Sequence, residues 1–172
     1  YVYTRSGNFV TQQQKLVATD GATNDLFGTS VALVGNMLIV GAPGDNSSRG
    51  AVYVFTRSGS TWTQQAKLVS SDGASGDELG TSLSLTTIVQ RWIIVVGTPK
   101  DDNAGPAGTT GGADAGSAYV FTASTLSNPP AWSQVEKIMA TDGSASDQFG
   151  TSVSASSTTS VIGAPNDSTL AG

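Results

Sequence analysis

The aspartates are the residues of this sequence best suited to chemistry, because they recur at fixed positions. A pair spaced five residues apart occurs three times, as Asp20 and Asp25, Asp72 and Asp77, and Asp142 and Asp147. A further aspartate stands two positions after a proline in three places, at Asp45, Asp101 and Asp167. Carboxylates can bind Ca²⁺, accept hydrogen bonds from the hydroxyl groups of a glycan, or act as acid and base in glycoside hydrolysis.

The composition excludes most other kinds of site. The 172 residues include no Cys and no His, which removes thiol nucleophiles, disulfides, histidine-based triads and the usual zinc or copper sites. The net charge is −5 and no basic stripe is present, so we expect no nucleic-acid partner. The longest apolar run, WIIVV at 92–96, is far too short to span a bilayer, so we expect no membrane insertion.

The repeated aspartates have a structural explanation and several functional ones. Aspartate next to glycine is typical of turns, where the carboxylate accepts backbone N–H groups, so the five-residue spacing can simply fix a loop. The alternatives are a Ca²⁺ site at Asp45, Asp101 and Asp167, or a carbohydrate-binding notch. Catalysis is disfavoured because the acidic residues recur in every copy, whereas an active site is normally unique. We predict that the protein is not an enzyme, and we expect no cofactor besides this Ca²⁺.

The aspartates belong to a unit that is written three times. The stretch KLVATDGATNDLFGTSVAL at 15–33 returns as KLVSSDGASGDELGTSLSL at 67–85 and as KIMATDGSASDQFGTSVSA at 137–155. Two insertions lengthen the middle copy, QRWI before Gly97 and DDNAGPAGTTGGADAG at 101–116. A repeat of this length indicates an array of similar structural units.

Each unit is predicted to form four short strands bounded by turn residues. In the first complete copy these are 29–34, 36–42, 51–56 and 62–69. The second is almost continuously apolar, as in a strand covered on both faces, and the fourth carries a lysine that protects an outer edge. Such a four-stranded antiparallel unit, repeated in tandem, is typical of the blades of a β-propeller. We predict an all-β chain, one repeat array over 1–172, divided into blades or parts of blades at 1–17, 18–69, 70–139 and 140–172.

Two motifs connect the chain with a known family. Phe-Gly and Gly-Ala-Pro recur in order, with Leu79 and Thr98 as the departures in the middle copy. The residues that match the motifs are Phe27, Gly28, Gly41, Ala42, Pro43, Phe149, Gly150, Gly163, Ala164 and Pro165. With these motifs, the sequence resembles the FG-GAP repeats of the integrin α-chain propeller and of microbial and algal surface proteins. The resemblance implies a propeller located outside the cell or at its surface, with a role in adhesion or ligand binding rather than catalysis.

Integrin-type repeats place a calcium loop between the two motifs, and this sequence lacks it. The corresponding turns are 34–36, 86–91 and 156–159, and none contains a carboxylate. Because Ca²⁺ needs about six to eight oxygen ligands, several of them usually charged, the calcium site of the family is not carried over to these turns. Any Ca²⁺ is expected instead in the loops at the other end of the strands.

Strand direction places the aspartates at that other end. In an up-and-down blade, the connection from the fourth strand to the next first strand and the connection from the second to the third emerge on the same face. All eleven aspartates fall in these connections, whereas Arg5 and Arg57 lie at the opposite end. We therefore expect an acidic face that binds a protein or a glycan. Its expected ligand-binding residues are Asp20, Asp25, Asp45, Asp72, Asp77, Asp101, Asp102, Asp142, Asp147 and Asp167.

The expected strands make about three blades, fewer than a closed propeller needs. Three arrangements follow: a portion of a longer propeller, identical chains that complete each other's split blade, and an open stack of units. The favoured interpretation is an extracellular adhesion or structural module that binds a protein or glycan partner, and the alternative is a lectin with sugar sites between blades. Asn46 and Asn166 match the N-glycosylation sequon and would be attachment points in a secreted eukaryotic protein.

Overall fold

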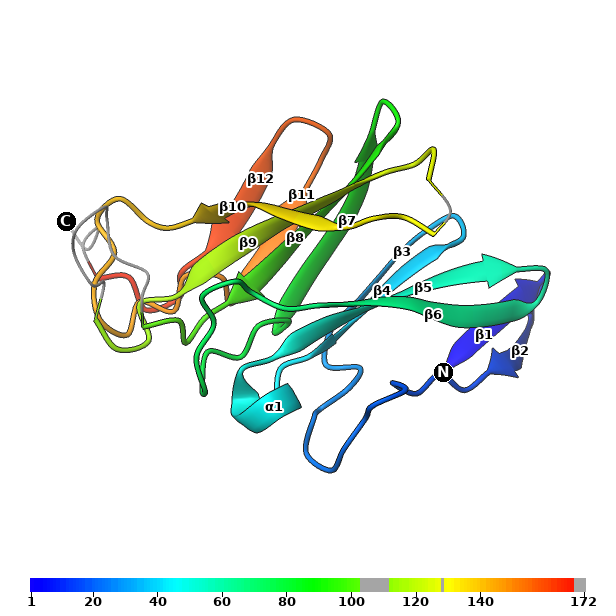
Figure 1. The fold of residues 1–172 in the computed structure, drawn as a ribbon, viewed down its shortest axis with the longest axis horizontal. Helices are drawn as coiled ribbons and strands as arrows, with labels where there is room; N and C mark the ends of the chain where they lie inside the picture. Colours follow the sequence, from blue (N-terminus) through cyan, green and yellow to red (C-terminus); the bar gives the residue numbers. More distant parts are fainter. Residues whose placement is uncertain (103–111, 128, 169–172) are drawn as a thin grey trace.

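The computed structural model describes residues 1–102, 112–127 and 129–168, so part of the predicted insertion at 101–116 lies outside the described residues. The described chain is almost entirely β-structure (Figure 1). Its strands are β1 (Val2–Ser6), β2 (Phe9–Gln14), β3 (Val31–Val34), β4 (Met37–Ala42), β5 (Ala51–Ser58), β6 (Thr61–Leu68), β7 (Ser82–Ile88), β8 (Arg91–Thr98), β9 (Ser117–Ser124), β10 (Ser133–Ile138), β11 (Ser152–Ala155) and β12 (Ser160–Gly163). The segment α1 (Asp45–Ser48) is one turn with positive φ at Asn46, Ser47 and Ser48. Among the described residues, no helix is long and apolar enough to cross a membrane.

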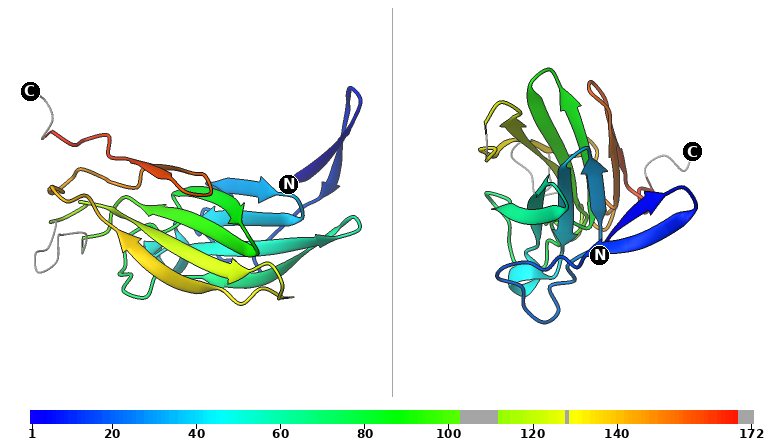
Figure 2. Two further views of the ribbon diagram at one scale, coloured as in Figure 1. Left: turned by 90° about the horizontal axis from the view of Figure 1, so that it is seen from above. Right: turned by 90° about the vertical axis from the view of Figure 1, so that its right-hand side faces the viewer.

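The strands form four antiparallel sheets that follow one another in chain order. Two are complete, with strand orders β3-β4-β5-β6 and β7-β8-β9-β10, and two are hairpins, β1-β2 and β11-β12. The hairpins lie at opposite ends of the series, on either side of the complete sheets (Figures 1 and 2). The predicted fold class is therefore confirmed: the described chain consists of FG-GAP-type blades and parts of blades, and it forms no closed barrel.

The strand limits differ from the predicted ones for local reasons. β3 begins at Val31 rather than at 29, because both the N–H and the hydroxyl of Thr29 donate to the carbonyl of Leu26 and keep this residue in a turn. β5 continues to Ser58 rather than ending at 56, and β6 runs one residue earlier than predicted at both ends, so the two meet at a tight turn where Gly59 has a φ of +60°. The QRWI insertion lengthens the β7–β8 hairpin, whose strands continue to Ile88 and restart at Arg91.

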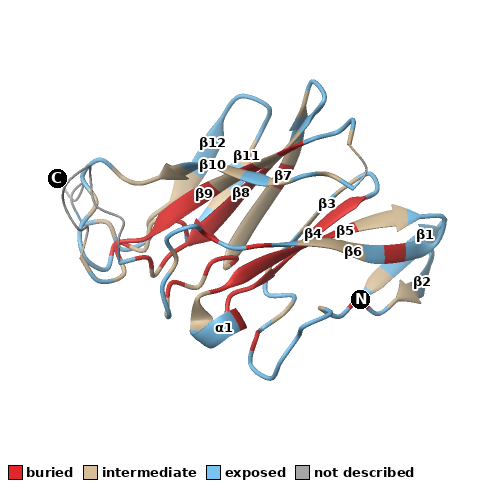
Figure 3. Ribbon diagram, viewed as in Figure 1, coloured by how far each residue is buried: buried red, intermediate tan, exposed pale blue. Residues whose placement is uncertain are grey.

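The second strand of each complete sheet is covered on both faces, as predicted. β4 is buried along its whole length (Figure 3). On one face, Ile39 lies in a cluster that includes Ile94 and Val96 of the next sheet. On the other face, Leu38 and Val40 lie in a second cluster. Burying both faces of a strand requires a neighbouring sheet on each side, which a single blade cannot supply.

The Phe-Gly and Gly-Ala-Pro motifs meet between neighbouring sheets. The carbonyl of Gly80 lies so close to Gly41 that a Cβ atom there would overlap it, and the same approach recurs between Gly150 and Gly97. The hydroxyl of Ser30 donates to the Gly80 carbonyl at 2.6 Å across this contact. The motif glycines therefore mark places where two backbones touch, and a side chain would separate them.

The residues before the motif glycines do not all occupy the same surroundings. Leu79, which replaces phenylalanine in the middle copy, is fully buried between the two complete sheets. Phe27 packs edge-on against Tyr53 and Phe55 of its own sheet, with ring centroids 5.6 and 6.2 Å apart. Both residues fill apolar space beside a motif glycine.

Substitution of Gly97 tests the close approach of the motifs. We expect Gly97→Ala to lower the free energy of unfolding by about 3 kcal/mol, because the new methyl group overlaps the Gly150 backbone. Gly21→Ala is the matched control, since its nearest neighbour would lie at an ordinary 3.4 Å. Urea denaturation of both variants measures the difference, and equal stability of the two would contradict the assigned role of the motif.

Candidate functional site

Three of the predicted aspartates fix the loops that lead into β3, β7 and β11. Asp25 accepts the backbone N–H of Ala22 at 2.6 Å, and Asp77 and Asp147 accept the N–H three residues earlier at the same distance. All three side chains are buried, and burial raises the pKa of Asp77. The five-residue spacing is thus accounted for by loop structure, and the predicted ligand-binding role of these three residues gains no support from their placement.

A second set of aspartates converges on a lysine in the first complete sheet. Lys67, on the outer strand β6, contacts Asp20 of the β2–β3 loop at 2.7 Å and Asp45 of the β4–β5 loop at 2.8 Å. Tyr53 of β5 donates its hydroxyl hydrogen to Asp45 at 2.7 Å, and the Lys67 ammonium lies 5.3 Å from the centre of the Tyr53 ring. One lysine therefore ties two loops to the outer half of the sheet.

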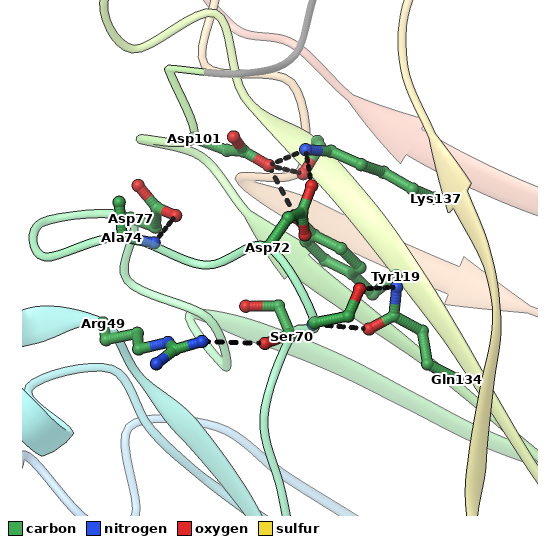
Figure 4. Close-up of polar contacts among 11 residues, drawn as sticks. Arg49, Ser70, Asp72, Ala74, Asp77, Asp101, Tyr119, Gln134 and Lys137 are labelled. Atoms are coloured by element: carbon green, nitrogen blue, oxygen red, sulfur yellow. Dashed lines mark hydrogen bonds and ion pairs between the residues drawn. The ribbon is translucent and has the colours of Figure 1, made fainter.

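The same network recurs in the second complete sheet (Figure 4). Lys137 of β10 contacts Asp72 of the β6–β7 loop at 2.7 Å and Asp101 of the β8–β9 loop at 2.8 Å. The Tyr119 hydroxyl lies 2.7 Å from Asp72 and 2.9 Å from Asp101, and the Ser117 hydroxyl donates to Asp101 at 2.6 Å. Because the Asp101 side chain is only 1% exposed, its charge depends on these partners for compensation.

The network fixes the charge state of its members. The hydrogen bond from Lys67 holds the pKa of Asp20 below its ordinary value. Burial alone would raise the pKa of Asp72, but the hydrogen bonds from Lys137 and Tyr119 outweigh it and the pKa is lowered. Burial would also lower the pKa of Lys137, yet its two carboxylate partners raise it, while burial raises that of Tyr119. At neutral pH Asp20, Asp72 and Lys137 are therefore charged and the Tyr119 phenol is neutral, a charge state suited to holding the loops in place.

Two of the predicted calcium ligands, Asp45 and Asp101, each lie against a lysine. Within the part of the chain that the structure describes, no group of three or more acidic side chains could hold a metal ion. In both complete sheets a lysine ammonium contacts the aspartate that was expected to bind the cation, so the positive charge is already supplied. Asp167, the third predicted ligand, is half-buried in the loop after β12.

Sequence reasoning missed the partners of these aspartates. Lys67 and Lys137 are predicted only to protect an outer edge, and Tyr53 and Tyr119 are given no role. The available signal was that lysine and tyrosine recur in every copy together with the aspartates. It could not show the pairing, because Lys67 lies 47 residues from Asp20 in the sequence.

The remaining predicted residues stay at the surface of the loop end. The Asp20 and Asp72 side chains are 48% and 44% exposed although each binds a lysine. Asp102 and Asp142 are exposed as well. Of the two sequon residues, Asn46 is exposed with a φ of +50°, and Asn166 is exposed and donates to Gln148 at 3.1 Å.

A hollow of about 420 Å³ opens beside the first network. Its polar lining includes Asp20, Asp45, Asn46, Arg49 and Lys67, so both hydrogen-bond donors and acceptors face it. Arg49 donates to the backbone carbonyl of Ser70 at 3.2 Å and so joins this loop to the next repeat. The hollow therefore lies where the loops of two successive repeats adjoin.

Removal of the network lysine tests its structural role. We expect Lys137→Met to lower the free energy of unfolding by about 3–5 kcal/mol, because the buried charge of Asp101 loses its partner. Lys15→Met is the matched control, because Lys15 occupies the equivalent position in the first copy and makes no ion pair within the described residues. We expect this variant to lose less than about 1 kcal/mol of unfolding free energy. Chemical denaturation in dilute solution compares the two variants. Similar losses of unfolding free energy would contradict the structural role assigned to Lys137.

Comparison with known proteins agrees with the motifs. The model of the FG-GAP repeat matches residues 10–55, 62–121 and 132–172. A search of curated proteins found no significant match. FG-GAP repeats are often extracellular adhesion-type modules and are generally not enzymes. Since the match spans most of the sequence and the sheets have the expected blade form, the chain belongs to the FG-GAP repeat family.

Proposed function

We propose that this chain is a non-catalytic, extracellular adhesion module that binds a partner through the acidic loop end of its blades. The observation that carries the proposal is the state of Asp20 and Asp72. Each side chain is held by a lysine at 2.7 Å and is nevertheless about half exposed. A charged group fixed in this way loses little conformational freedom when a partner binds, so less of the binding energy is lost.

The charge of the chain favours a partner with a basic surface. The net charge is −5, and the exposed Asp102 and Asp142 lie in loops at the same end as Asp20 and Asp72. Complementary charge speeds encounter and orients the partner, while exposed pairs add only modest affinity each. Repetition of the same fixed carboxylate from blade to blade suits a ligand that spans several repeats.

A catalytic role is less well supported. The buried carboxylates are engaged by lysine, tyrosine or backbone N–H groups, and the lowered pKa of Asp20 and Asp72 is unsuited to a general acid at neutral pH. Burial raises the pKa of the Asp77 carboxyl, but this side chain is enclosed in its loop and accepts the N–H of Ala74.

A lectin is the second candidate, and the hollow of about 420 Å³ favours it. Its lining combines carboxylates, an amide, a guanidinium and an ammonium, which suit the hydroxyl groups of a sugar. A glycan seated there would contact Asn46 and Asp45 rather than depend on the more distant Asp72.

Binding assays on immobilised chain distinguish the two candidates. The probes are an array of lysine- and arginine-rich peptides and an array of neutral and charged glycans, each measured with Ca²⁺ and with EDTA. We expect peptide binding that weakens with salt, falls roughly two- to fivefold in Asp20→Asn and in Asp72→Asn, and is unchanged by Ca²⁺. Glu136→Gln, an equal change of charge at an exposed position on β10, is the control.

The outcomes separate clearly. Glycan binding that is insensitive to salt and is lost in Asn46→Ala would replace the proposal with the lectin. Peptide binding that is equally strong in the aspartate variants and in the control would contradict the acidic loop end as the contact surface. Failure of both arrays would remove the binding proposal and leave a structural repeat.

A further inference from the structure

One arginine at the loop end forms no ion pair with a carboxylate. Arg49 directly follows α1 and lines the hollow of about 420 Å³ beside the first network. Among the described residues it forms no ion pair, whereas Lys67, the other cation that lines this hollow, contacts two aspartates. The positive charge of Arg49 is therefore available to a ligand in the hollow.

The hydrogen bonding of Arg49 is also incomplete. Its Nη2 atom donates to the backbone carbonyl of Ser70 at 3.2 Å (Figure 4). Its Nε–H is buried without a partner among the described residues, and so is the hydroxyl of Ser70, both atoms lying next to Gly73. A guanidinium carries five N–H donors in a planar fork that matches the two oxygens of a carboxylate. Arg49 thus keeps donors for a further acceptor.

The second complete sheet shows that a blade does not need this arginine. Ala115 occupies the place of Arg49, since the carbonyl of each accepts the backbone N–H of the residue before the next motif glycine, at 3.0 and 3.1 Å. In the sequence, Ala140 likewise stands where Ser70 stands. The network of Lys137 and the contact between repeats both form there without the arginine and the serine. Neither feature therefore depends on Arg49.

The rest of the lining supplies hydrogen-bond acceptors and a small apolar surface. The Asp20 side chain is 48% exposed, and Asp45 and Asn46 come from the loop after β4. Asn46 is exposed, and the second network has an aspartate, Asp102, at its position. Carboxylate and amide oxygens accept hydrogen bonds from sugar hydroxyl groups. Val69, which is 44% exposed, offers an apolar surface to the C–H groups of a sugar ring.

These two parts of the lining restrict the class of ligand. A simple anion meets Asp20, Asp25 and Asp45 as well as Arg49 in this hollow, so repulsion offsets the attraction of the guanidinium. A neutral sugar uses the acceptors and leaves Arg49 without a counter-charge. A sugar that carries a carboxylate brings hydroxyl groups for the acceptors and two oxygens for the guanidinium. A sugar acid is the class that satisfies both parts.

We propose that the hollow lined by Arg49 and Asp20 binds a sugar acid, such as a hexuronic acid unit of a glycan, with its carboxylate on Arg49 and its hydroxyl groups on the acceptors. The volume of about 420 Å³ lies within the range of small-ligand sites, roughly 300–1,000 Å³. This inference rests on the lectin candidate for the hollow and names its ligand. It does not depend on a basic partner at the acidic loop end.

Titrations followed by two-dimensional amide NMR spectra provide the test. The probes are the methyl glycosides of glucuronic and galacturonic acid and their neutral counterparts, together with acetate and N-acetylalanine as carboxylates without a sugar. The protein is produced in bacterial cells, so that the sequon at Asn46 carries no glycan. We expect one of the uronides to bind roughly tenfold more tightly than its neutral counterpart, and the two simple carboxylates to bind far more weakly than either.

The substitution Arg49→Gln tests the contact with the carboxylate. We expect the roughly tenfold preference for the acid sugar to disappear while the affinity for the neutral sugar stays unchanged, because only the acid form uses the guanidinium. A damaged fold would lower both affinities together, so their ratio separates binding from a structural effect. Arg49→Lys keeps the charge without the planar fork and should retain part of the preference.

Arg91→Gln is the matched control for the loss of charge. Arg91 is exposed at the start of β8, at the opposite end of the strands, so this variant should keep the full preference for the acid sugar. Urea denaturation of the three variants checks that each keeps the fold. Shifted amide signals in the loops around Ala22 and Asn46 are expected on binding, because both residues line the hollow.

The contrary results are distinct from one another. Equal affinity for the acid and neutral sugars would overturn the inference and leave the lectin candidate in place. Absence of binding to any sugar would overturn both, whereas the peptide array decides the acidic loop end separately. Acetate or N-acetylalanine bound as tightly as the uronides would contradict a sugar ligand. An equal loss of preference in Arg49→Gln and Arg91→Gln would remove Arg49 from the site.

Discussion

The structure depends on one constraint: the second strand of each blade must be covered on both faces. β4 is buried over its whole length because the next sheet covers Ile39 and the cluster around Trp62 covers Leu38 and Val40. A single four-stranded sheet has no means of meeting this requirement, so the unit is stable only in a series. The glycines of the two family motifs follow from the same constraint, because neighbouring sheets approach closely enough for the Gly80 carbonyl to touch Gly41.

The stacking also decides what the aspartates do. Loops that emerge at one end of tightly packed strands bring many carboxylates together, and the chain compensates them from within. Lys67 and Lys137 reach across from the outer strands, and Tyr53 and Tyr119 complete the networks from the strands beside them. In both complete sheets a lysine ammonium thus lies against the buried aspartate of the loop after the second strand. The partly exposed carboxylates of Asp20 and Asp72 are the ones that we propose for contact with a partner.

Much of the fold could be predicted from the sequence because its signals are local. Runs such as MLIVGA and AVYVFT favour strands, and glycine and asparagine at 35–36 favour the turn between them. The Phe-Gly and Gly-Ala-Pro motifs identify the repeat because close contact between two backbones requires glycine at these positions. The site was less predictable, since the pairing of Lys67 with Asp20 joins residues far apart in the chain, and burial of Asp45 depends on that pairing. Five-residue spacing indicated a loop for Asp25, Asp77 and Asp147, but it did not show that their side chains point inward.

Hydrogen exchange of the backbone amides in dilute solution tests the central constraint most directly. If coverage of both faces holds the fold together, the amides of β4, β5, β8 and β9 exchange last and at similar rates, in a single cooperative unit. The amides of β1-β2, which is exposed along most of its length, and of β11-β12, which contains no buried residue, exchange much earlier. Protection of either hairpin equal to that of β4 would contradict the account, because a largely uncovered hairpin would then be as stable as a sheet packed on both sides.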